Sequence, residues 1–195
     1  MEYEIRPLTA GLVNDYVAFF DTEKHSDNKD EHKCYCVCWC SDDHRLGLER
    51  MVDAGKRRAL AIEYVKTGLI RGYLAYMDNR VVGWCNANDK NKCQHCISWL
   101  RFLNDVKIQE SGKPKTKAVF CFAIASEYRK KGIATGLLKK VCEDAIKEGY
   151  DIVEAYPKKE MKNLDNFEGP LSMYLKQGFS ITEDHGEYYT VKKDL

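Results

Sequence analysis

The spacing of hydrophobic and polar positions changes abruptly within residues 119–149. Every residue from Val119 to Ala125 is apolar, which is typical of a strand buried on both faces. From Ala134 to Ile146 the apolar residues instead recur at steps of three and four, with Lys, Glu and Asp between them, and this period predicts an amphipathic helix. Gly149 follows as a residue well suited to end that helix. The pattern therefore predicts a buried strand that leads into a helix through a short turn.

The turn itself, residues 129–134, is basic and contains Gly132. The first turn of a helix presents unpaired backbone N–H groups and the positive end of the helix dipole. Gly132 allows a ligand to approach the backbone closely, and three cations stand beside it. An ordinary strand–helix connection with solvated lysines is the alternative. The ligand that the arrangement suits is a pyrophosphate.

The other elements are predicted from the same kinds of pattern. Apolar or alternating runs indicate strands at residues 3–8, 72–77, 81–88, 150–156, 179–182 and 188–191. Residues 78–80 form a compact turn between two of them. Helices are expected after Thr9, from Asp42 or Asp43 to Gly68, and from Pro170 to Gly178.

The turn and the order of the elements resemble the GNAT superfamily of N-acetyltransferases. Its pattern Q/R-x-x-G-x-G/A is matched by Arg129, Gly132 and Ala134, between a strand and a helix. Residues 173–179 are similar to the family's late helix, which ends L-Y-x-K-x-G-F. The resemblance implies one α/β domain over residues 1–195, with a mixed, mostly antiparallel sheet flanked by helices and splayed at the cofactor-binding strand.

The resemblance also implies an acyltransferase that uses acetyl-CoA as cosubstrate. The pantetheine arm and acetyl carbonyl would meet the backbone of Phe122, Ala123 and Ile124. The pyrophosphate would be held by Arg129, Lys130, Lys131, Gly132, Ile133, Ala134 and Thr135. Tyr174 corresponds to the tyrosine that protonates the departing thiolate, and a phenol with a pKa of about 10 is a fair proton donor at neutral pH.

Two positions depart from the family pattern. Some relatives place a glutamate general base near the start of the central strand, where this chain has Lys117, Ala118 and Val119. The base is therefore unassigned, and a water relay or another carboxylate must serve. Many relatives have an asparagine seven residues before the tyrosine, and here that position is Phe167.

Cysteines form the least usual part of the chain. The segment Cys34–Cys40 has a cysteine at every second position, and Cys93 and Cys96 form another pair. If the segment is extended, its four thiols face one way, which is a poor way to surround a tetrahedral zinc ion. We expect no metal, and a structural segment that walls the acceptor pocket, with Trp39 as a candidate substrate-binding residue. Trp84 is expected to be a core residue, with substrate binding as the lesser alternative. A Cys–His catalytic pair is a weaker rival, because buried cysteines are commonly inert.

Composition and charge exclude other classes. The chain has 195 residues, 44% of them hydrophobic and 31% charged, enough for a proper core. A net charge of +1 argues against a nucleic-acid or membrane partner. No apolar run approaches the ~20 residues of a membrane span, and residues 1–4 do not resemble a signal peptide. These features and the odd cysteine count, nine, predict a reduced, cytoplasmic protein.

Several functions remain open at this level. The leading one is an N-acetyltransferase acting on a small-molecule amine, with acetylation of a protein lysine or N-terminal amine as the alternative. A non-catalytic acyl-CoA-binding or sensing domain is another. A nucleotide-phosphate enzyme is disfavoured, because neither G-x-x-x-x-G-K-[ST] nor G-x-G-x-x-G opens the helix. The acceptor is not identified, homodimer formation is left open, and residues 89–117 are where we expect acceptor specificity to be decided.

Overall fold

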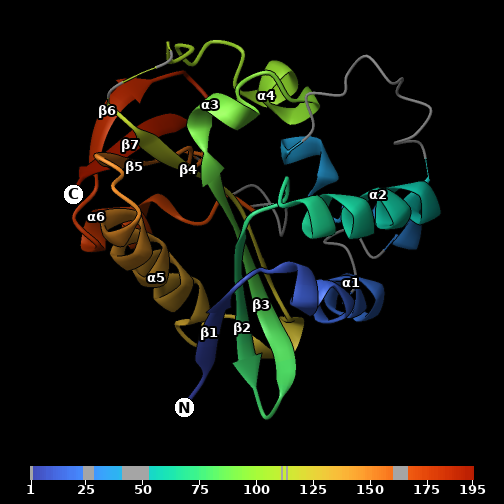
Figure 1. Ribbon diagram of the computed structural model, residues 1–195. Coiled ribbons are helices and arrows are strands. Elements are labelled where there is room, and N and C mark those ends of the chain that lie inside the picture. Colours follow the sequence, from blue (N-terminus) through green and yellow to red (C-terminus); the bar gives the residue numbers. More distant parts are fainter. Residues whose placement is uncertain (1, 24–28, 41–52, 111, 113, 160–166) are drawn as a thin grey trace.

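One mixed sheet runs through the protein (Figure 1). The computed structural model describes residues 2–23, 29–40, 53–110, 112, 114–159 and 167–195. The seven strands lie in the order β1-β2-β3-β4-β5-β7-β6. Their bounds are β1 Glu4–Pro7, β2 Gly72–Met77, β3 Arg80–Asp89, β4 Thr116–Ile124, β5 Ile152–Ala155, β6 Ser180–Asp184 and β7 Tyr189–Asp194. β4 and β5 are parallel and the other pairs of described strands are antiparallel, as predicted.

Helices cover both faces of the sheet (Figure 1). The bounds of the α-helices are α1 Val13–Thr22, α2 Ala54–Thr67, α3 Lys90–Cys93, α4 Ile97–Phe102, α5 Ile133–Lys147 and α6 Leu171–Lys176. Short 3-10 turns are η1 Ala10–Leu12, η2 Asp30–His32, η3 Val37–Trp39 and η6 Ser126–Tyr128. One core joins α1, α2, α4 and η3 to one face around Tyr16 and Trp84. The other joins α5 and α6 to the opposite face around Leu138 and Tyr174.

The predicted turns and helix ends agree closely with the structure where it describes them. Asp78 and Asn79, between β2 and β3, both have positive φ (49° and 60°), as a tight hairpin turn with the twist of the strands requires. Helix α2 ends at Gly68, with φ of 72°. Its N-cap is Asp53, whose carboxylate accepts a hydrogen bond from the Lys56 amide at 2.7 Å. Asp42 and Asp43, predicted as alternative caps, lie outside the described residues.

An irregularity in β4 creates the opening on which the site depends. Asn86 pairs with Cys121 but Ala87 pairs with Val119, so Phe120 is an extra residue of β4, a β-bulge. Pairing between β4 and β5 runs from Thr116 only to Val119, opposite Ala155. The bulge therefore begins where the two parallel strands separate. Beyond it, residues 120–124 have no partner on the β5 side among the described strands. This loss of pairing is the predicted splay, and the side of β4 that lacks a strand partner is called the β4 gap below.

The segment Cys34–Cys40 is not extended. Tyr35 and Cys36 are left-handed, with φ of 46° and 50°, and η3 follows directly. The segment is turned because it is anchored from several sides: the Tyr16 hydroxyl donates to the Tyr35 carbonyl at 2.8 Å, and the Trp84 indole N–H donates to Cys36 Sγ at 3.3 Å. The four thiols therefore do not form a single row.

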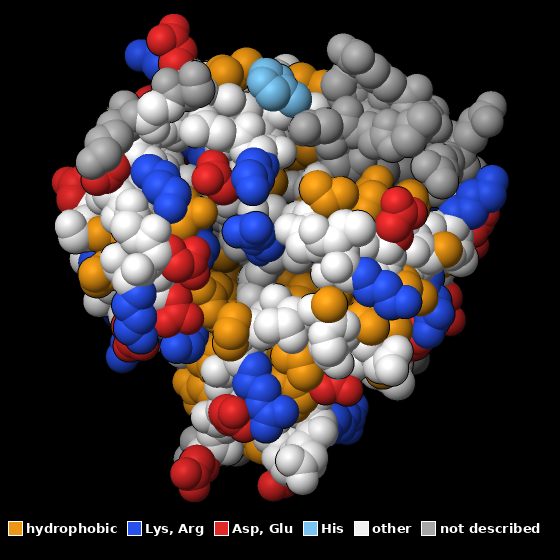
Figure 2. All heavy atoms as spheres, viewed as in Figure 1, with side chains coloured by type: hydrophobic (Ala, Val, Ile, Leu, Met, Phe, Trp, Pro, Cys, Tyr) orange, Lys and Arg blue, Asp and Glu red, His pale blue; other side chains and the backbone are white. Residues whose placement is uncertain are grey.

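The surface in this view carries both signs of charge. Figure 2 shows Lys and Arg side chains interspersed with Asp and Glu over this face, as the net charge of +1 leads one to expect. Within the described residues, no helix combines the length and apolar character that crossing a bilayer requires.

Candidate active site

The basic turn places a helix N-terminus at the end of β4. Gly132 is the N-cap of α5, with φ of 83°, and it provides no side-chain cap. Lys130 is also left-handed, with φ of 60°. The first hydrogen bond of the helix runs from the Gly136 amide to the Gly132 carbonyl at 2.9 Å. The amides of residues 133–135 thus have no acceptor within the helix and are available to an anion.

The space in front of this turn is open. An added Cβ at Gly132 would meet no atom within 4 Å, so a phosphate can approach the backbone. The Ile133 side chain is buried in the α5 core, so this residue can contribute only its amide. Arg129 donates from Nε to the Ile124 carbonyl at 3.1 Å, which ties the turn to the end of β4. The turn predicted to hold the pyrophosphate is therefore fixed against the end of the strand predicted to hold the pantetheine arm.

The free edge of β4 offers backbone groups to the gap. The Ala125 amide donates to the Val82 carbonyl at 3.0 Å, so the alternation of an antiparallel ladder turns the amides of Phe122 and Ile124 away from β3. The Phe122 amide donates to the Phe167 carbonyl at 2.6 Å. Phe167 thus occupies part of this edge through its backbone, although its side chain cannot replace the asparagine of the family pattern.

Tyr174, in α6, is linked to the edge of β4 through the backbone of Phe167 and Glu168. Its ring is fully buried and packs edge-on against Phe179, and its hydroxyl donates to the Glu168 carbonyl at 2.6 Å. Burial raises the pKa of Tyr174 well above its ordinary value, and neighbouring groups including Glu168 add to the effect. The phenol is therefore protonated at neutral pH, the state that a general acid needs.

Glu168 is the residue that the sequence did not single out. Its side chain is 11% exposed, and Oε1 lies 3.7 Å from Lys158 Nζ. Burial raises the pKa of the Glu168 carboxyl to about 7, against the opposing effect of the Lys158 ammonium. Residue 168 ends a polar stretch that resembles any solvated loop, so its burial could not be inferred from the pattern.

Aromatic rings cover the bulge of β4 on the face opposite α5. Trp39 stacks on Phe120, with ring centroids 5.0 Å apart and planes at 18°. Phe102 and Phe167 complete this aromatic wall, with centroids 6.2 Å and 6.4 Å from that of Trp39. Trp39 is itself buried and belongs to the same core cluster as Phe120. Trp84 is completely buried beneath Tyr16, which supports its interpretation as a core residue.

The cysteines have the properties of structural thiols. Burial raises the pKa of Cys38 to about 11 and that of Cys40 to about 12. Cys121 hydrogen-bonds with Cys36, which lowers its pKa, but burial and the nearby Cys34 and Glu168 outweigh this and raise it. Since the thiolate is the nucleophile and the metal ligand, these environments disfavour cysteine catalysis. No group of three or more His, Cys, Asp or Glu in the described parts of the chain has a geometry suited to a metal.

We predict nine reactive thiols on denaturation. None of the nine cysteines is in a disulfide bond, so the protein denatured without reductant should titrate close to that number with a thiol reagent. Elemental analysis of the native protein should find no stoichiometric zinc. One tightly held zinc per chain would overturn this account of Cys34–Cys40 and of Cys93 and Cys96.

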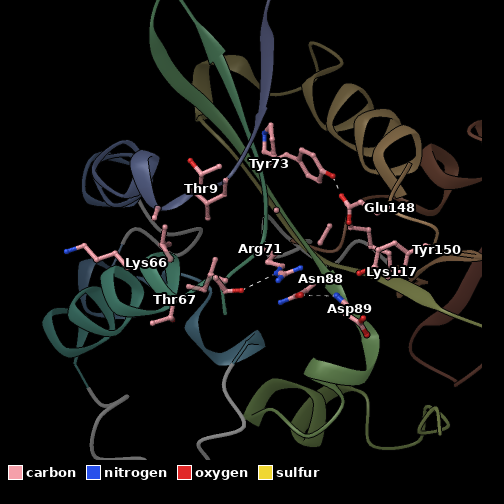
Figure 3. Close-up of a pocket in the computed structure, with 18 residues that line it drawn as sticks. Thr9, Lys66, Thr67, Arg71, Tyr73, Asn88, Asp89, Lys117, Glu148 and Tyr150 are labelled. Carbon is pink, nitrogen blue, oxygen red and sulfur yellow. Dashed lines mark hydrogen bonds and ion pairs between the residues drawn. The ribbon is translucent and has the colours of Figure 1, made fainter. Parts of the chain in front are cut away.

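A separate cavity of about 430 Å³ lies at the other end of β4 and α5. In Figure 3, Tyr73, Lys117, Glu148 and Tyr150 gather on one side of it, across from Thr9, Lys66 and Thr67. The Lys117 ammonium contacts both Glu148 carboxylate oxygens at 3.0 Å and the Tyr73 hydroxyl at 3.3 Å. At the start of β4, the charge of Lys117 is therefore balanced by that of Glu148. This cavity is remote from the β4 gap.

Comparison with known proteins confirms the resemblance to the GNAT family. The model of the acetyltransferase (GNAT) family matches residues 11–179. The fold is similar to that of an aminoglycoside acetyltransferase from an uncultured soil metagenomic sample (15% identity, 96% of this chain and 97% of that one, TM-score 0.61). It is also similar to the PaiA N-acetyltransferase of Thermoplasma acidophilum in complex with coenzyme A (18% identity, 100% of each chain, TM-score 0.56). A third protein with a similar fold is the ribosomal-protein-alanine N-acetyltransferase of Brucella melitensis (16% identity, 98% of this chain and 99% of that one, TM-score 0.55). No curated protein matches the chain significantly.

Proposed function

The chain belongs to the GNAT family of acetyltransferases, and from this premise we propose that it transfers the acetyl group of acetyl-CoA to a primary amine of a small molecule, with Tyr174 as general acid. The observation that carries the proposal is the position of the β4 gap. An anion-binding helix N-terminus stands at one end of it, and a buried, protonated phenol borders it.

Each part of the gap has a chemical task in this proposal. The amides at the start of α5, with Arg129, Lys130 and Lys131, hold the pyrophosphate, where the helix dipole and the cations favour negative charge. The β4 edge around Phe122, Ala123 and Ile124 aligns the pantetheine arm by strand-like hydrogen bonds. Since the Phe122 amide already donates to the Phe167 carbonyl, the Ile124 N–H is the group of this edge that polarises the thioester carbonyl as it gains negative charge. Tyr174 protonates the sulfur that leaves.

The acceptor is proposed to be compact because two segments close over β4 from the other face. Cys34–Cys40 and α4 meet there, and the aromatic wall of Trp39, Phe102, Phe120 and Phe167 covers the bulge. Such rings attract an ammonium group through cation–π interactions. An extended peptide acceptor needs a long groove or a free strand edge, and on this face β4 is overlaid by side chains instead.

The test is a panel of acceptors with acetyl-CoA, followed by the release of free thiol. Small primary amines, including polyamines and aminoglycosides, should give turnover above the rate without acceptor. Peptides with a free N-terminus or a lysine should give much less. Turnover confined to the peptides would contradict the proposed acceptor class, and no turnover with any amine would contradict the proposed function.

A further inference from the structure

The buried carboxylate of Glu168 lies next to Tyr174 in the structure, and one of its oxygens lacks a hydrogen-bond partner among the described residues. Among the described residues, Glu168 is the one Asp or Glu with a buried side-chain oxygen, Oε2, that has no hydrogen-bond partner. An unsatisfied buried carboxylate oxygen costs stability, and such a group in a functional gap suggests a task that requires it. We propose that Glu168 is the general base that removes a proton from the acceptor ammonium, an inference that rests on the function proposed above.

The position of Glu168 ties it to both sides of the gap. Its backbone carbonyl accepts the hydrogen bond of the Tyr174 hydroxyl at 2.6 Å. The preceding carbonyl, of Phe167, accepts from the Phe122 amide on β4 at 2.6 Å. The following residue, Gly169, is so close to β4 that an added Cβ would lie 3.4 Å from the Phe122 ring. The base and the acid are thus held by one short piece of backbone against the strand where the thioester is proposed to lie.

The groups that face the carboxylate set its strength as a base. Lys158 approaches Oε1, while Tyr174 from α6 and Cys121 from β4 are near enough for the charge of Glu168 to raise the pKa of each. Tyr174 and Cys121 are neutral at pH 7, so Lys158 is the charged group among these three. With a pKa of about 7, the carboxylate is far more basic than an exposed glutamate and is still substantially ionised at neutral pH, the optimum for a general base.

Two other carboxylates, the buried Glu154 and the exposed Glu148, are already paired with lysines. Glu154 accepts from Lys90 at 2.7 Å and from Tyr156 at 2.6 Å, and Lys192 lies 3.5 Å from its second oxygen. Glu148 is paired with Lys117 at the far end of β4. Neither has a free oxygen beside the gap, so Glu168 is the carboxylate that takes the role left open by Lys117, Ala118 and Val119.

The proton balance of the step is simple. Glu168 takes one proton from the ammonium, which frees the nitrogen lone pair, and later passes that proton to water. The nitrogen attacks the thioester carbon, the C–N bond forms and the C–S bond breaks. Tyr174 gives its proton to the thiolate and is reprotonated by the second proton that the nitrogen loses as it becomes an amide.

Glu168→Gln tests the proposal because it keeps the shape of the side chain and removes the base. With a basic amine at pH 7.5, kcat should fall by roughly 10²–10⁴-fold. In the wild type, kcat/KM should rise with pH through about 7, since the ionised carboxylate is the active form. In the variant, kcat/KM should no longer rise through this pH range. The difference in rate between the variant and the wild type should shrink as the pH approaches the pKa of the amine, because the solvent then deprotonates the amine.

A weakly basic acceptor separates a base from a merely structural residue. Hydroxylamine or an aromatic amine is already neutral at pH 7.5, so Glu168→Gln should lower its acetylation far less than that of the basic amine. An equal loss for both acceptors would assign Glu168 a structural role and overturn the proposal. Glu168→Asp, which retains the carboxylate, should recover part of the activity, and its kcat/KM should still rise with pH as that of the wild type does.

The controls separate this proposal from the proposed function. Glu143→Gln removes an exposed carboxylate of α5 and should leave the rates and the pH profile unchanged. Binding of CoA to Glu168→Gln, measured by calorimetry, should equal that of the wild type, which shows that the variant is folded. If the wild type acetylates amines and the variant does so equally well, only the assignment of Glu168 fails. If the wild type acetylates none, the proposed function fails.

Discussion

Replacing Tyr174 with phenylalanine is expected to lower kcat by roughly 10²–10⁴-fold, the usual contribution of a positioned acid. The dissociation constant of acetyl-CoA should barely change, because the substitution removes a proton donor and no group that binds substrate and transition state alike. The ring stays packed against Phe179. The Glu168 carbonyl loses its 2.6 Å hydrogen bond, which should lower the free energy of unfolding by about 1–3 kcal/mol. Steady-state kinetics and urea denaturation measure the two effects separately.

Tyr16→Phe is the matched control for this variant. Tyr16 is also fully buried, and its hydroxyl also donates to a backbone carbonyl, that of Tyr35, at 2.8 Å. The control should lose a comparable amount of stability without the large fall in kcat. If Tyr174→Phe retained a near-normal kcat on a good amine, Tyr174 would be removed from the mechanism and water would be the acid.

The second large effect concerns the pyrophosphate turn: Gly132→Asp should abolish the stabilisation of the protein by CoA. The wild type should gain thermal stability from CoA and acetyl-CoA, by about 2.7 kcal/mol at a ligand concentration of 100 times Kd, and much less from ATP or NAD. An aspartate would place a negative charge against the pyrophosphate. The same charge is favourable at a helix N-terminus, and Asp tolerates a φ of 83° better than most residues, so the fold should persist.

Gly132→Asn separates charge from shape at this position. Asparagine fills the same space without the charge and should retain a reduced but measurable shift with CoA in the same thermal-denaturation assay. Undiminished CoA binding by Gly132→Asp, or equal protection of the wild type by ATP, would count decisively against the assignment of the turn.

The strand, the turn and the helix of residues 119–149 were predictable because their signals are local. A continuous apolar run, a glycine where φ is positive, and a helical period each act within a few residues. The hairpin at Asp78 and Asn79 and the end of α2 at Gly68 follow from the same kind of signal. The widening between β4 and β5 was predictable only by resemblance, since the bulge at Phe120 depends on the register of two strands.

The parts that could not be predicted depend on tertiary contacts. Cys34–Cys40 alternates like a strand, but hydrogen bonds from Tyr16 and Trp84 hold it in a turned conformation, and these residues lie far from it in sequence. Glu168 resembles a loop residue, and its raised pKa arises only because the chain folds it against β4 and α6. Residues whose role is created by burial leave no pattern in the sequence.

We propose above that acetyl groups pass directly from acetyl-CoA to an amine at the β4 gap. The most direct test of this claim is a reaction of the wild type with acetyl-CoA labelled with ¹³C in the acetyl group and the best amine of the panel, with products identified by mass spectrometry. We predict one labelled amide for each free CoA thiol. Release of thiol with labelled acetate in place of the amide would contradict the claim, as would labelled amide formed equally well by Gly132→Asp.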